Sequence, residues 1–172
     1  VDLLTVAGHK LYAPKGVGAL YLRRGVQVEP LIHGAGHERG RRASTENVAG
    51  IVGLGEACRI AEENLVETVE RLQALRDRLH QNLITHGVEI SLNGHPTERL
   101  PNTLNVSFAG IDSNSLLAML PEVAISTGSA CHAGQTEPSG VLLAMGTPRA
   151  TALGAVRFSL GRWTTGEEMD QA

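Results

Sequence analysis

Two residues of this chain suit covalent chemistry, a lysine near the start and a cysteine toward the end. Lys10 follows Gly8 and His9 directly after an apolar run. The glycine lets a ligand approach the backbone closely, and the histidine brings an imidazole beside the amine. Lysine is the side chain that forms Schiff bases with carbonyl cofactors. A lysine after a strand is most often a solvated surface residue, so the prediction of imine chemistry depends on these neighbours.

Cys131 follows a run of small residues, 126–130, and precedes His132. The thiolate is the nucleophilic form of cysteine, small neighbours leave it reachable, and an adjacent imidazole can help to hold its charge. Cys58, by contrast, lies on the apolar side of a helical pattern, where we expect a small buried hydrophobe. A zinc site built from Cys131, His132 and another histidine is the alternative, although neither a C-x-x-C pair nor a histidine spacing supports it.

A reachable thiol and an imine-forming lysine in one chain suggest an enzyme that takes sulfur from an amino acid bound to pyridoxal phosphate. Arg157 is a candidate for the substrate's carboxylate, because a guanidinium is a forked donor to that group. It lies in an alternating run, 155–160, whose apolar members share one face while Arg157 and Ser159 share the other. A solvated arginine on an edge strand is the alternative, and spacing alone does not decide between them.

The segment 34–47 combines glycines, cations and hydroxyls just ahead of a helical pattern. Hydroxyls and free amide groups at the start of a helix favour phosphate. The segment is not a Walker loop, since it has no Gly-Lys-Ser/Thr ending. It therefore predicts an anion site of another kind.

The elements that must position these groups alternate in the manner of a compact α/β or α+β protein. Apolar residues recur every three or four positions over 48–65 and 66–84, which predicts two helices. In the second helix we expect a buried face of Val69, Leu72, Leu75, Leu79 and Leu83, and a solvated side of Glu70, Arg71, Arg76, Asp77 and Arg78. We further expect a buried parallel strand at 3–7, strands at 18–23, 88–92, 103–108, 124–127 and 155–160, and short helices at 113–120, behind a possible serine cap, and 139–145.

Composition excludes several classes of protein. Hydrophobic residues make up 42% and charged residues 19% of the 172 residues, as in soluble globular proteins. A net charge of −3 gives no electrostatic reason to expect nucleic acid, and no apolar run or signal peptide points to a membrane. Two cysteines make no disulfide framework, so we expect a cytoplasmic protein that binds neither nucleic acid nor membrane. Because the chain opens inside an apolar run and closes on a helix start, we also expect a piece of a larger protein, cut at both ends.

Five motifs in order resemble those of the pyridoxal-phosphate cysteine desulfurases of the NifS/IscS branch, within the class V aminotransferase superfamily. They occupy 8–21, 36–47, 101–108, 128–131 and 157–162, nearly the whole chain. The resemblance implies an α/β fold, the C-terminal part of a fold-type I pyridoxal-phosphate transferase, with the edge of a large-domain sheet, a long helix and a small α+β domain. Residues 1–65 would be the end of the large cofactor-binding domain with its connecting helix. Residues 66–172 would be the small C-terminal domain with the cysteine loop.

The resemblance also implies a role for each candidate residue. Lys10 would hold pyridoxal 5'-phosphate covalently, His9 would lie beside it, and Thr45 would contact the phosphate in the neighbouring subunit of a homodimer. Arg157 would bind the α-carboxylate of L-cysteine. Cys131 would take its sulfur as a persulfide, leaving L-alanine, and pass it to a sulfur-acceptor or scaffold protein for iron–sulfur cluster assembly or thiolation. No metal is implied.

Two departures from the family pattern matter. Many relatives have serine at the position of Ala7, so one phosphate contact would be lost. The family's ring-stacking histidine and the acid that pairs with the pyridine nitrogen precede the region matched here, and we therefore expect residues 1–172 alone to be inactive. A selenocysteine lyase, another class V aminotransferase-like lyase, and a non-catalytic dimerisation or sulfur-acceptor-binding module remain as alternatives.

Overall fold

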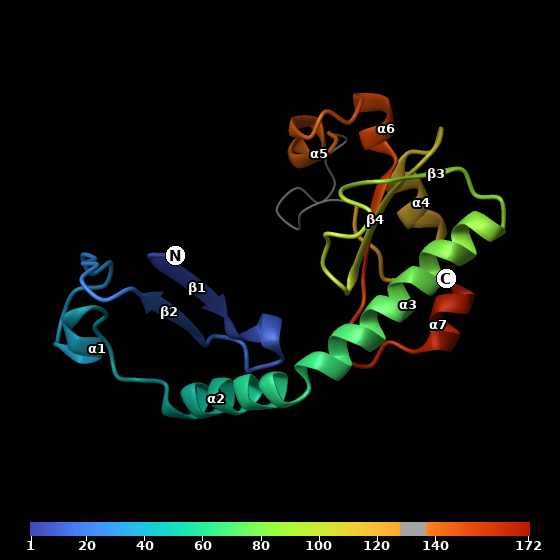
Figure 1. Cartoon of the computed structure of the whole chain (residues 1–172). Coiled ribbons are helices and arrows are strands. Elements are labelled where there is room, and N and C mark those ends of the chain that lie inside the picture. Colours follow the sequence, from blue (N-terminus) through green and yellow to red (C-terminus); the bar gives the residue numbers. More distant parts are fainter. Residues whose placement is uncertain (128–136) are drawn as a thin grey trace. The chain divides into compact units, whose positions relative to one another are not determined.

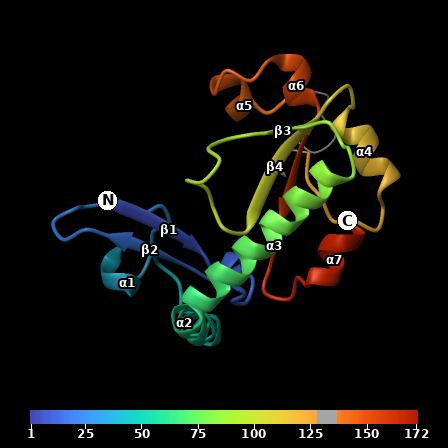
Figure 2. The ribbon, with the colours of Figure 1, turned by 45° about the vertical axis from the view of Figure 1, so that its right-hand side comes forward.

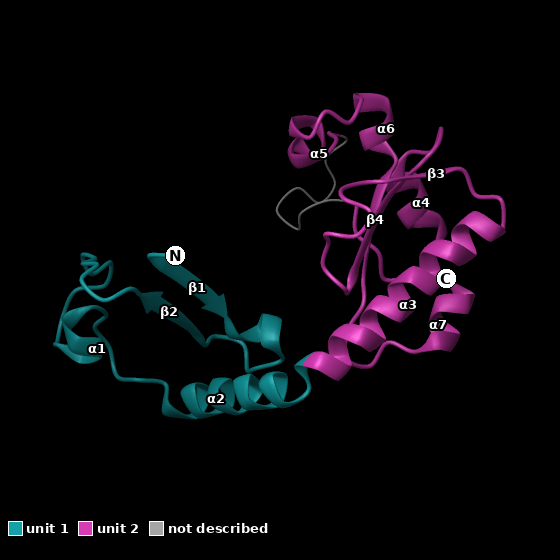
Figure 3. Cartoon of the chain, in the orientation of Figure 1, with its two compact units in different colours: residues 1–65 teal, residues 66–172 magenta. Residues whose placement is uncertain are grey.

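The computed structural model describes residues 1–127 and 137–172 (Figure 1). The chain separates into two compact units, residues 1–65 and residues 66–172 (Figure 3). The assignment of the first to a large cofactor-binding domain and of the second to a small C-terminal domain stays a prediction. Within the described residues, no helix combines the length and the apolarity that crossing a membrane requires.

The first unit begins with a two-stranded sheet. Strands β1 (Leu3–Ala7) and β2 (Gly18–Leu22) pair antiparallel, with Leu3 opposite Leu22 and Ala7 opposite Gly18. The two strands were expected from the sequence, but the prediction that residues 3–7 form a buried parallel strand is wrong for the described chain. The partner of β1 is antiparallel, and the residues of β1 are exposed or half-buried.

The connection between these strands requires glycine at two positions, Gly8 and Gly18, where another part of the backbone lies close by. The 3-10 helix η1 (Gly8–Leu11) follows β1 at once, and the Gly8 amide donates to the Val17 carbonyl at 2.9 Å. A Cβ atom on Gly8 would lie 2.6 Å from that carbonyl oxygen, and one on Gly18 would lie 2.4 Å from the Val6 oxygen. Backbone oxygens cannot move aside cheaply, so both glycines are required for the approach that presents the η1 turn.

Helix α2 (Val48–Glu63) covers the turn region of this unit. Its first turn is capped by Asn47, whose Oδ1 accepts from the Gly50 amide at 3.1 Å. Gly53 faces Pro14 so closely that an added Cβ would lie 2.9 Å from the proline ring. The buried residues of α2 are Gly50 and Ala57. Cys58 is exposed, so the prediction of a buried thiol at this position is wrong.

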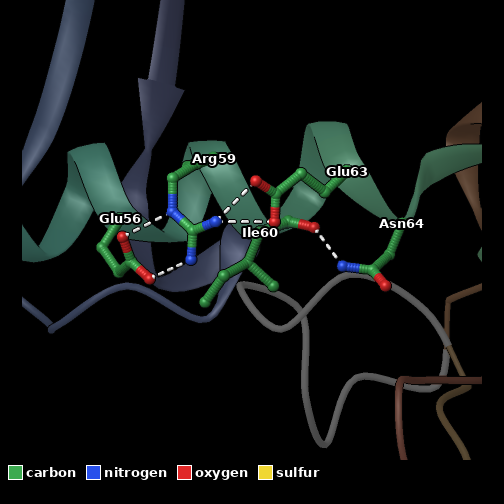
Figure 4. A network of polar contacts seen from close by, with 5 residues as sticks. All are labelled: Glu56, Arg59, Ile60, Glu63 and Asn64. Carbon is green, nitrogen blue, oxygen red and sulfur yellow. Dashed lines mark hydrogen bonds and ion pairs between the residues drawn. The ribbon is translucent and has the colours of Figure 1, made fainter.

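The outer side of α2 carries a small ionic network (Figure 4). Arg59 lies between Glu56 and Glu63, one turn to either side, with 2.6 Å contacts to both carboxylates. The Ile60 carbonyl accepts twice from Asn64, from its side chain at 2.8 Å and from its backbone amide at 3.2 Å. All of these charged groups are half exposed, so the network contributes little to stability.

The second unit is a three-stranded antiparallel sheet with helices packed on it. The strands β3 (Ile90–Leu92), β4 (Thr103–Phe108) and β5 (Ala155–Ser159) lie in the order β3-β4-β5. Figures 1 and 2 show the long helix α3 (Leu65–Thr85) beside the sheet, with α7 (Gly166–Gln171) next to it. The helices α4 (Ser113–Met119), α5 (Gly140–Ala144) and α6 (Arg149–Leu153) complete the unit. The buried core joins α3, β4, β5 and α7 through Leu72, Leu79, Leu104, Val106, Phe108, Val156, Phe158, Leu160 and Met169.

Two arginines of α3, Arg71 and Arg76, were expected to be solvent-exposed, but both form hydrogen bonds with other parts of the chain. Arg76 is 3% exposed, donates to the Leu100 carbonyl at 2.9 Å and pairs with Asp77 at 2.8 Å. Arg71 donates to three carbonyls of the β5–α7 connection, those of Thr164 and Arg162 at 2.8 Å and that of Gly161 at 3.4 Å. The apolar face of α3 is confirmed, since Leu72 and Leu79 are buried and Leu75 and Leu83 pack against the core.

Three shorter predictions in this unit need correction. The cap of α4 is Asp112, which accepts from the Ser115 amide at 2.9 Å, and not a serine. Residues 124–127 form one isolated bridge and not a strand. Helix α6 was not expected. The capping box of α7, in contrast, is present as the sequence suggested, between Thr165 and Glu168.

Candidate functional site

Lys10 lies on η1, immediately beyond the end of β1. Both Lys10 and His9 are exposed. Neither side chain has a hydrogen bond or ion pair with any residue in 1–127 or 137–172. The turn ends at Tyr12, which has left-handed backbone angles, φ 63° and ψ 18°. An amine on a short turn fixed at both ends is available to a carbonyl group.

Thr45 lines a hollow in the same unit. The hollow has a volume of about 440 Å³ and lies between the turn at Gly16–Gly18 and the segment that precedes α2. Its donors include the side chains of Arg42, Ser44, Thr45 and Asn47, and the carboxylates of Glu38 and Glu46 also reach it. The start of α2 adds little to these donors, because the Val48 amide donates to the Glu46 carbonyl at 2.9 Å and the Gly50 amide donates to Oδ1 of Asn47 at 3.1 Å. The hollow therefore offers hydroxyls and a guanidinium beside two carboxylates, and the anion site expected at 34–47 stays a prediction.

The backbone around these groups is held in unusual conformations. Within the described residues, the non-glycine residues with positive φ are Tyr12, Glu38, Arg39 and Ser44, at 63°, 51°, 59° and 100°. All of them belong to the first unit, and Glu38 and Ser44 line the hollow. Left-handed backbone costs of order 1–3 kcal/mol at such residues and is often found at functional sites. Helix α1 (His37–Gly40) contains two of the four, which makes it an irregular turn.

Arg157 lies in the second unit, on β5. Its backbone neighbours are Asn105 of β4 on one side and Ser126 on the other. The Arg157 amide donates to the Ser126 carbonyl at 2.7 Å, and the Ser126 amide donates back at 3.1 Å. The predicted alternation of β5 is confirmed, because Val156 and Phe158 are buried and Arg157 is exposed. Its guanidinium has no hydrogen-bond or ion-pair partner among the described residues.

Cys131 and His132 lie outside the described residues, which stop at Thr127 and resume at Glu137. The structure does define where this segment starts. Ser126 is bridged to Arg157, and the Thr127 hydroxyl donates to Oδ1 of Asn114 at 3.1 Å. Sequence reasoning missed the contact between Thr127 and Asn114, because the two residues are 13 positions apart and no local pattern links them. No group of three metal-ligating side chains occurs in 1–127 and 137–172.

The structure thus groups the candidate residues within each unit. Lys10 and His9 share the η1 turn, and Thr45 lines a hollow bounded by the turn that contacts η1. Arg157 is paired with the residue that leads toward Cys131. The first group presents an amine and anion donors, and the second presents an exposed guanidinium.

Comparisons with known proteins give one consistent result. The family model described as Aminotransferase class-V matches residues 1–172. The chain is 50% identical over 173 residues to "Cysteine desulfurase 2" of Trichormus variabilis and 51% identical over 174 residues to "Cysteine desulfurase IscS" of Clostridium botulinum. Each match covers 99% of this chain, but 43% and 44% of those relatives. The chain therefore spans less than half the length of the curated relatives that it matches.

Solved structures agree. The chain is similar to "NIFS-LIKE PROTEIN" with a TM-score of 0.87 and 40% identity, over 99% of this chain and 44% of that one. It is also similar to the structure titled "SspA in complex with cysteine", with a TM-score of 0.66 and 33% identity, over 96% of this chain and 45% of that one. The predicted fold, a part of a mixed α/β transferase of the NifS-like kind, is confirmed by these likenesses.

Proposed function

This chain belongs to the class-V aminotransferase family, and from that premise we propose that the protein is a pyridoxal-phosphate-dependent cysteine desulfurase. It takes sulfur from L-cysteine, leaves L-alanine and passes the sulfur to an acceptor or scaffold protein, for iron–sulfur cluster assembly or thiolation. The observation that carries this proposal is the identity of about one half to curated cysteine desulfurases over 99% of the chain. We further propose that the full-length protein is a homodimer and works in the cytoplasm.

The residues present fit pyridoxal phosphate. The cofactor needs an amine for its aldehyde, and Lys10 is an exposed amine without a partner in the described parts of the chain. It also needs donors for a phosphate, and the hollow around Thr45 offers two hydroxyls and the guanidinium of Arg42. In the family's arrangement, Thr45 serves the phosphate in the neighbouring subunit. That arrangement agrees with a hollow whose lining does not include Lys10.

Each residue then has one task. When bound, pyridoxal phosphate supplies an electron sink that weakens the bonds at the carbons of the attached amino acid. Lys10 holds the cofactor, and His9 lies beside it. Arg157 receives the substrate carboxylate through two parallel N–H donors, which orients the substrate as well as binding it.

The sulfur transfer uses the thiol. The Cys131 thiolate attacks the sulfur of the bound cysteine, so an S–S bond forms while the C–S bond breaks. The electron pair of the broken bond stays with the substrate carbon, which takes up a proton and leaves as alanine. The sulfur remains as a persulfide on Cys131, and a second thiol then removes it by attack on the outer sulfur.

The test separates the two covalent residues in the full-length protein. Cys131→Ser should abolish sulfide and alanine production from L-cysteine while leaving the yellow absorbance of the lysine-bound cofactor intact. Lys10→Ala should remove that absorbance. Substantial sulfide release by the serine variant would refute the role of Cys131 and favour another class V lyase, since a lyase that needs no thiol would be unaffected. Unchanged absorbance in the alanine variant would refute the role of Lys10.

A further inference from the structure

We propose that Asn105 is a second substrate-binding residue, which donates a hydrogen bond to the carboxylate that Arg157 holds, and that Asn93 positions its amide. The inference rests on the proposed function, because the ligand is the α-carboxylate of L-cysteine. All three residues belong to the second unit and to the part of the chain that the structure describes.

The pairing of β4 with β5 puts Asn105 next to Arg157. The two residues stand directly opposite each other in the antiparallel ladder. Residues so paired share one face of the sheet, with their Cβ atoms about 4.5–5.5 Å apart. This face lies opposite the main core, because Val106 and Val156, the adjacent residues on the two strands, are fully buried in that core. Asn105 is half-buried and Arg157 is exposed. Since the asparagine side chain is short and the arginine side chain is long, a ligand that the guanidinium holds against the sheet lies over Asn105.

Asn93 determines which end of the Asn105 amide is available. The Nδ2 atom of Asn93 donates to Oδ1 of Asn105 at 2.8 Å and to Oγ of Ser107 at 2.9 Å. Asn93 is also held through its backbone, because its amide donates to the Asn105 carbonyl at 2.9 Å. The Asn105 oxygen already accepts, so its Nδ2 is left to donate, and this nitrogen has no partner in 1–127 or 137–172. The fixed amide therefore presents a donor beside an exposed guanidinium.

A bound carboxylate can use this donor. Its two oxygens offer about four lone-pair positions, and a guanidinium that binds through two parallel N–H groups occupies two of them. The Asn105 amide then supplies a third hydrogen bond from the surface of the sheet. Three donors from two neighbouring strands fix the direction of the carboxylate as well as its position, and they favour ligands that carry this group.

The experiment uses the full-length protein loaded with its cofactor. Asn105→Ala removes the donor, and the KM for L-cysteine should rise about tenfold, the effect of one hydrogen bond to a charged group. Asn105→Asp keeps the shape and the oxygen that accepts from Asn93, but it puts a negative charge where the donor was. The KM should then rise on the order of 100-fold, because like charges meet. The inhibition constant of L-alanine, which carries the same carboxylate, should rise by the same factors while kcat stays unchanged. A merely structural Asn105 would tolerate aspartate better than alanine.

The positioning role of Asn93 has its own variant. Asn93→Asp puts oxygen where the donor was, so the Asn105 amide has to turn its nitrogen toward position 93 and its oxygen toward the substrate. We expect the KM for L-cysteine to rise about as much as in Asn105→Ala. The double variant, Asn93→Asp with Asn105→Ala, should bind L-cysteine no more weakly than Asn105→Ala alone, because both changes remove the same donor.

Asn102 provides the matched control. It is another half-buried asparagine, directly before β4, and its side chain donates to the Leu160 carbonyl at 3.4 Å and accepts from the Thr103 hydroxyl at 3.2 Å. Asn102→Ala should lower the melting temperature about as much as Asn105→Ala does, with the KM unchanged. Normal saturation of Asn105→Asp, fully additive effects in the double variant, or an equal rise of the KM in Asn102→Ala would each overturn the inference. Cys131→Ser, measured alongside, separates the two failures: sulfide release by that variant refutes the proposed function, whereas the inhibition constant of L-alanine decides the role of Asn105.

Discussion

At the scale of single residues, Arg157 gives the sharpest prediction about binding. Its guanidinium is exposed on the polar face of β5 and has no partner within the described residues. Arg157→Ala in the full-length protein should remove a charge-assisted pair with the substrate carboxylate, roughly 1.5–3 kcal/mol. The measurement is the KM for L-cysteine, which should rise on the order of 10- to 100-fold with cofactor content unchanged.

Arg162 is the matched control for that variant. It lies five positions further on, with its guanidinium 5.8 Å from the centre of the Trp163 ring. Arg162→Ala should leave the saturation by cysteine close to that of the unmodified protein. If Arg157→Ala saturates normally and Arg162→Ala does not, the carboxylate role belongs to Arg162.

His80 gives a prediction about pH. Burial lowers the pKa of this half-buried imidazole below 6.5, and the nearby Arg99 and Arg76 lower it further, against the opposing charge of Asp77. The unfolded chain therefore binds a proton at a higher pH than the folded chain does. The resulting stability is complete above pH 6.5 and is lost as the pH falls from there through the folded-state pKa.

Urea unfolding followed by circular dichroism at a series of pH values checks this prediction. His80→Gln should flatten the fall in unfolding free energy just below pH 6.5. The carboxyl of Asp170 provides an internal reference, because its hydrogen bonds with Arg78 and Asn82 hold its pKa below the ordinary value of 3.8. Any fall in stability that Asp170 causes should persist in the variant at lower pH. An unchanged slope below pH 6.5 would contradict the assignment to His80.

The residue scale is also where sequence reasoning misplaced side chains. Hydropathy put Arg76 in water, but a carbonyl and a carboxylate within hydrogen-bond reach allow its burial. Cys58 was placed inside because its helix face is apolar, yet the described unit buries only the small residues Gly50 and Ala57 of that helix. A hydropathy pattern predicts burial from the average preference of each residue type. The actual burial of Arg76 and Cys58 depends on residues that are distant in the sequence. The exposure of Arg157, in contrast, agrees with the alternation of polar and apolar residues along β5.

At the scale of elements, long periodic runs were predictable and short ones were not. The helices at 48–63 and 65–85 and the strands β4 and β5 follow from apolar spacing that local sequence carries. The segment 124–127 failed as a strand because its pairing is limited to one bridge, at Ser126. Helix α6, five residues after Pro148, has too few positions to show a period.

Arg71 carries the prediction at this scale, because it joins α3 to the connection between β5 and α7. Three carbonyls accept from its guanidinium, and a lysine ammonium cannot reproduce that forked geometry. Arg71→Lys should lower the free energy of unfolding by about 1.5–3 kcal/mol, the range for hydrogen bonds to a charged group. Calorimetry measures the loss. Arg59→Lys is the control, since its exposed pairs with Glu56 and Glu63 should make no measurable difference. Equal small effects at both sites would show that the Arg71 contacts do not hold the connection.

At the scale of the whole molecule, the candidate residues are divided between two units. Lys10 and Thr45 belong to residues 1–65, and Arg157 belongs to residues 66–172. Local sequence could name these residues, but it could not predict how the two units come together. The chain also spans less than half the length of its curated relatives.

The last prediction concerns residues 1–172 prepared alone. The β1–β2 sheet shows apolar side chains on both faces, Leu4 and Tyr21 on one and Leu3 and Leu20 on the other, each about half exposed. Two-stranded sheets are marginal in water, and each strand here has one edge without a partner strand among the described residues. We expect the isolated chain to associate into dimers or larger species, to bind pyridoxal phosphate weakly and to release negligible sulfide from L-cysteine.

Light scattering and a sulfide assay on the same sample test this prediction. Replacing Leu20 and Tyr21 together by lysine puts a charge on each face of the sheet and should shift the population toward monomer. A double change of Ile84 and Met119 to lysine, both exposed in the second unit, is the control and should leave the association unchanged. A monomer that turns over cysteine at an enzyme's usual rate would show that the residues needed for catalysis all lie within this chain.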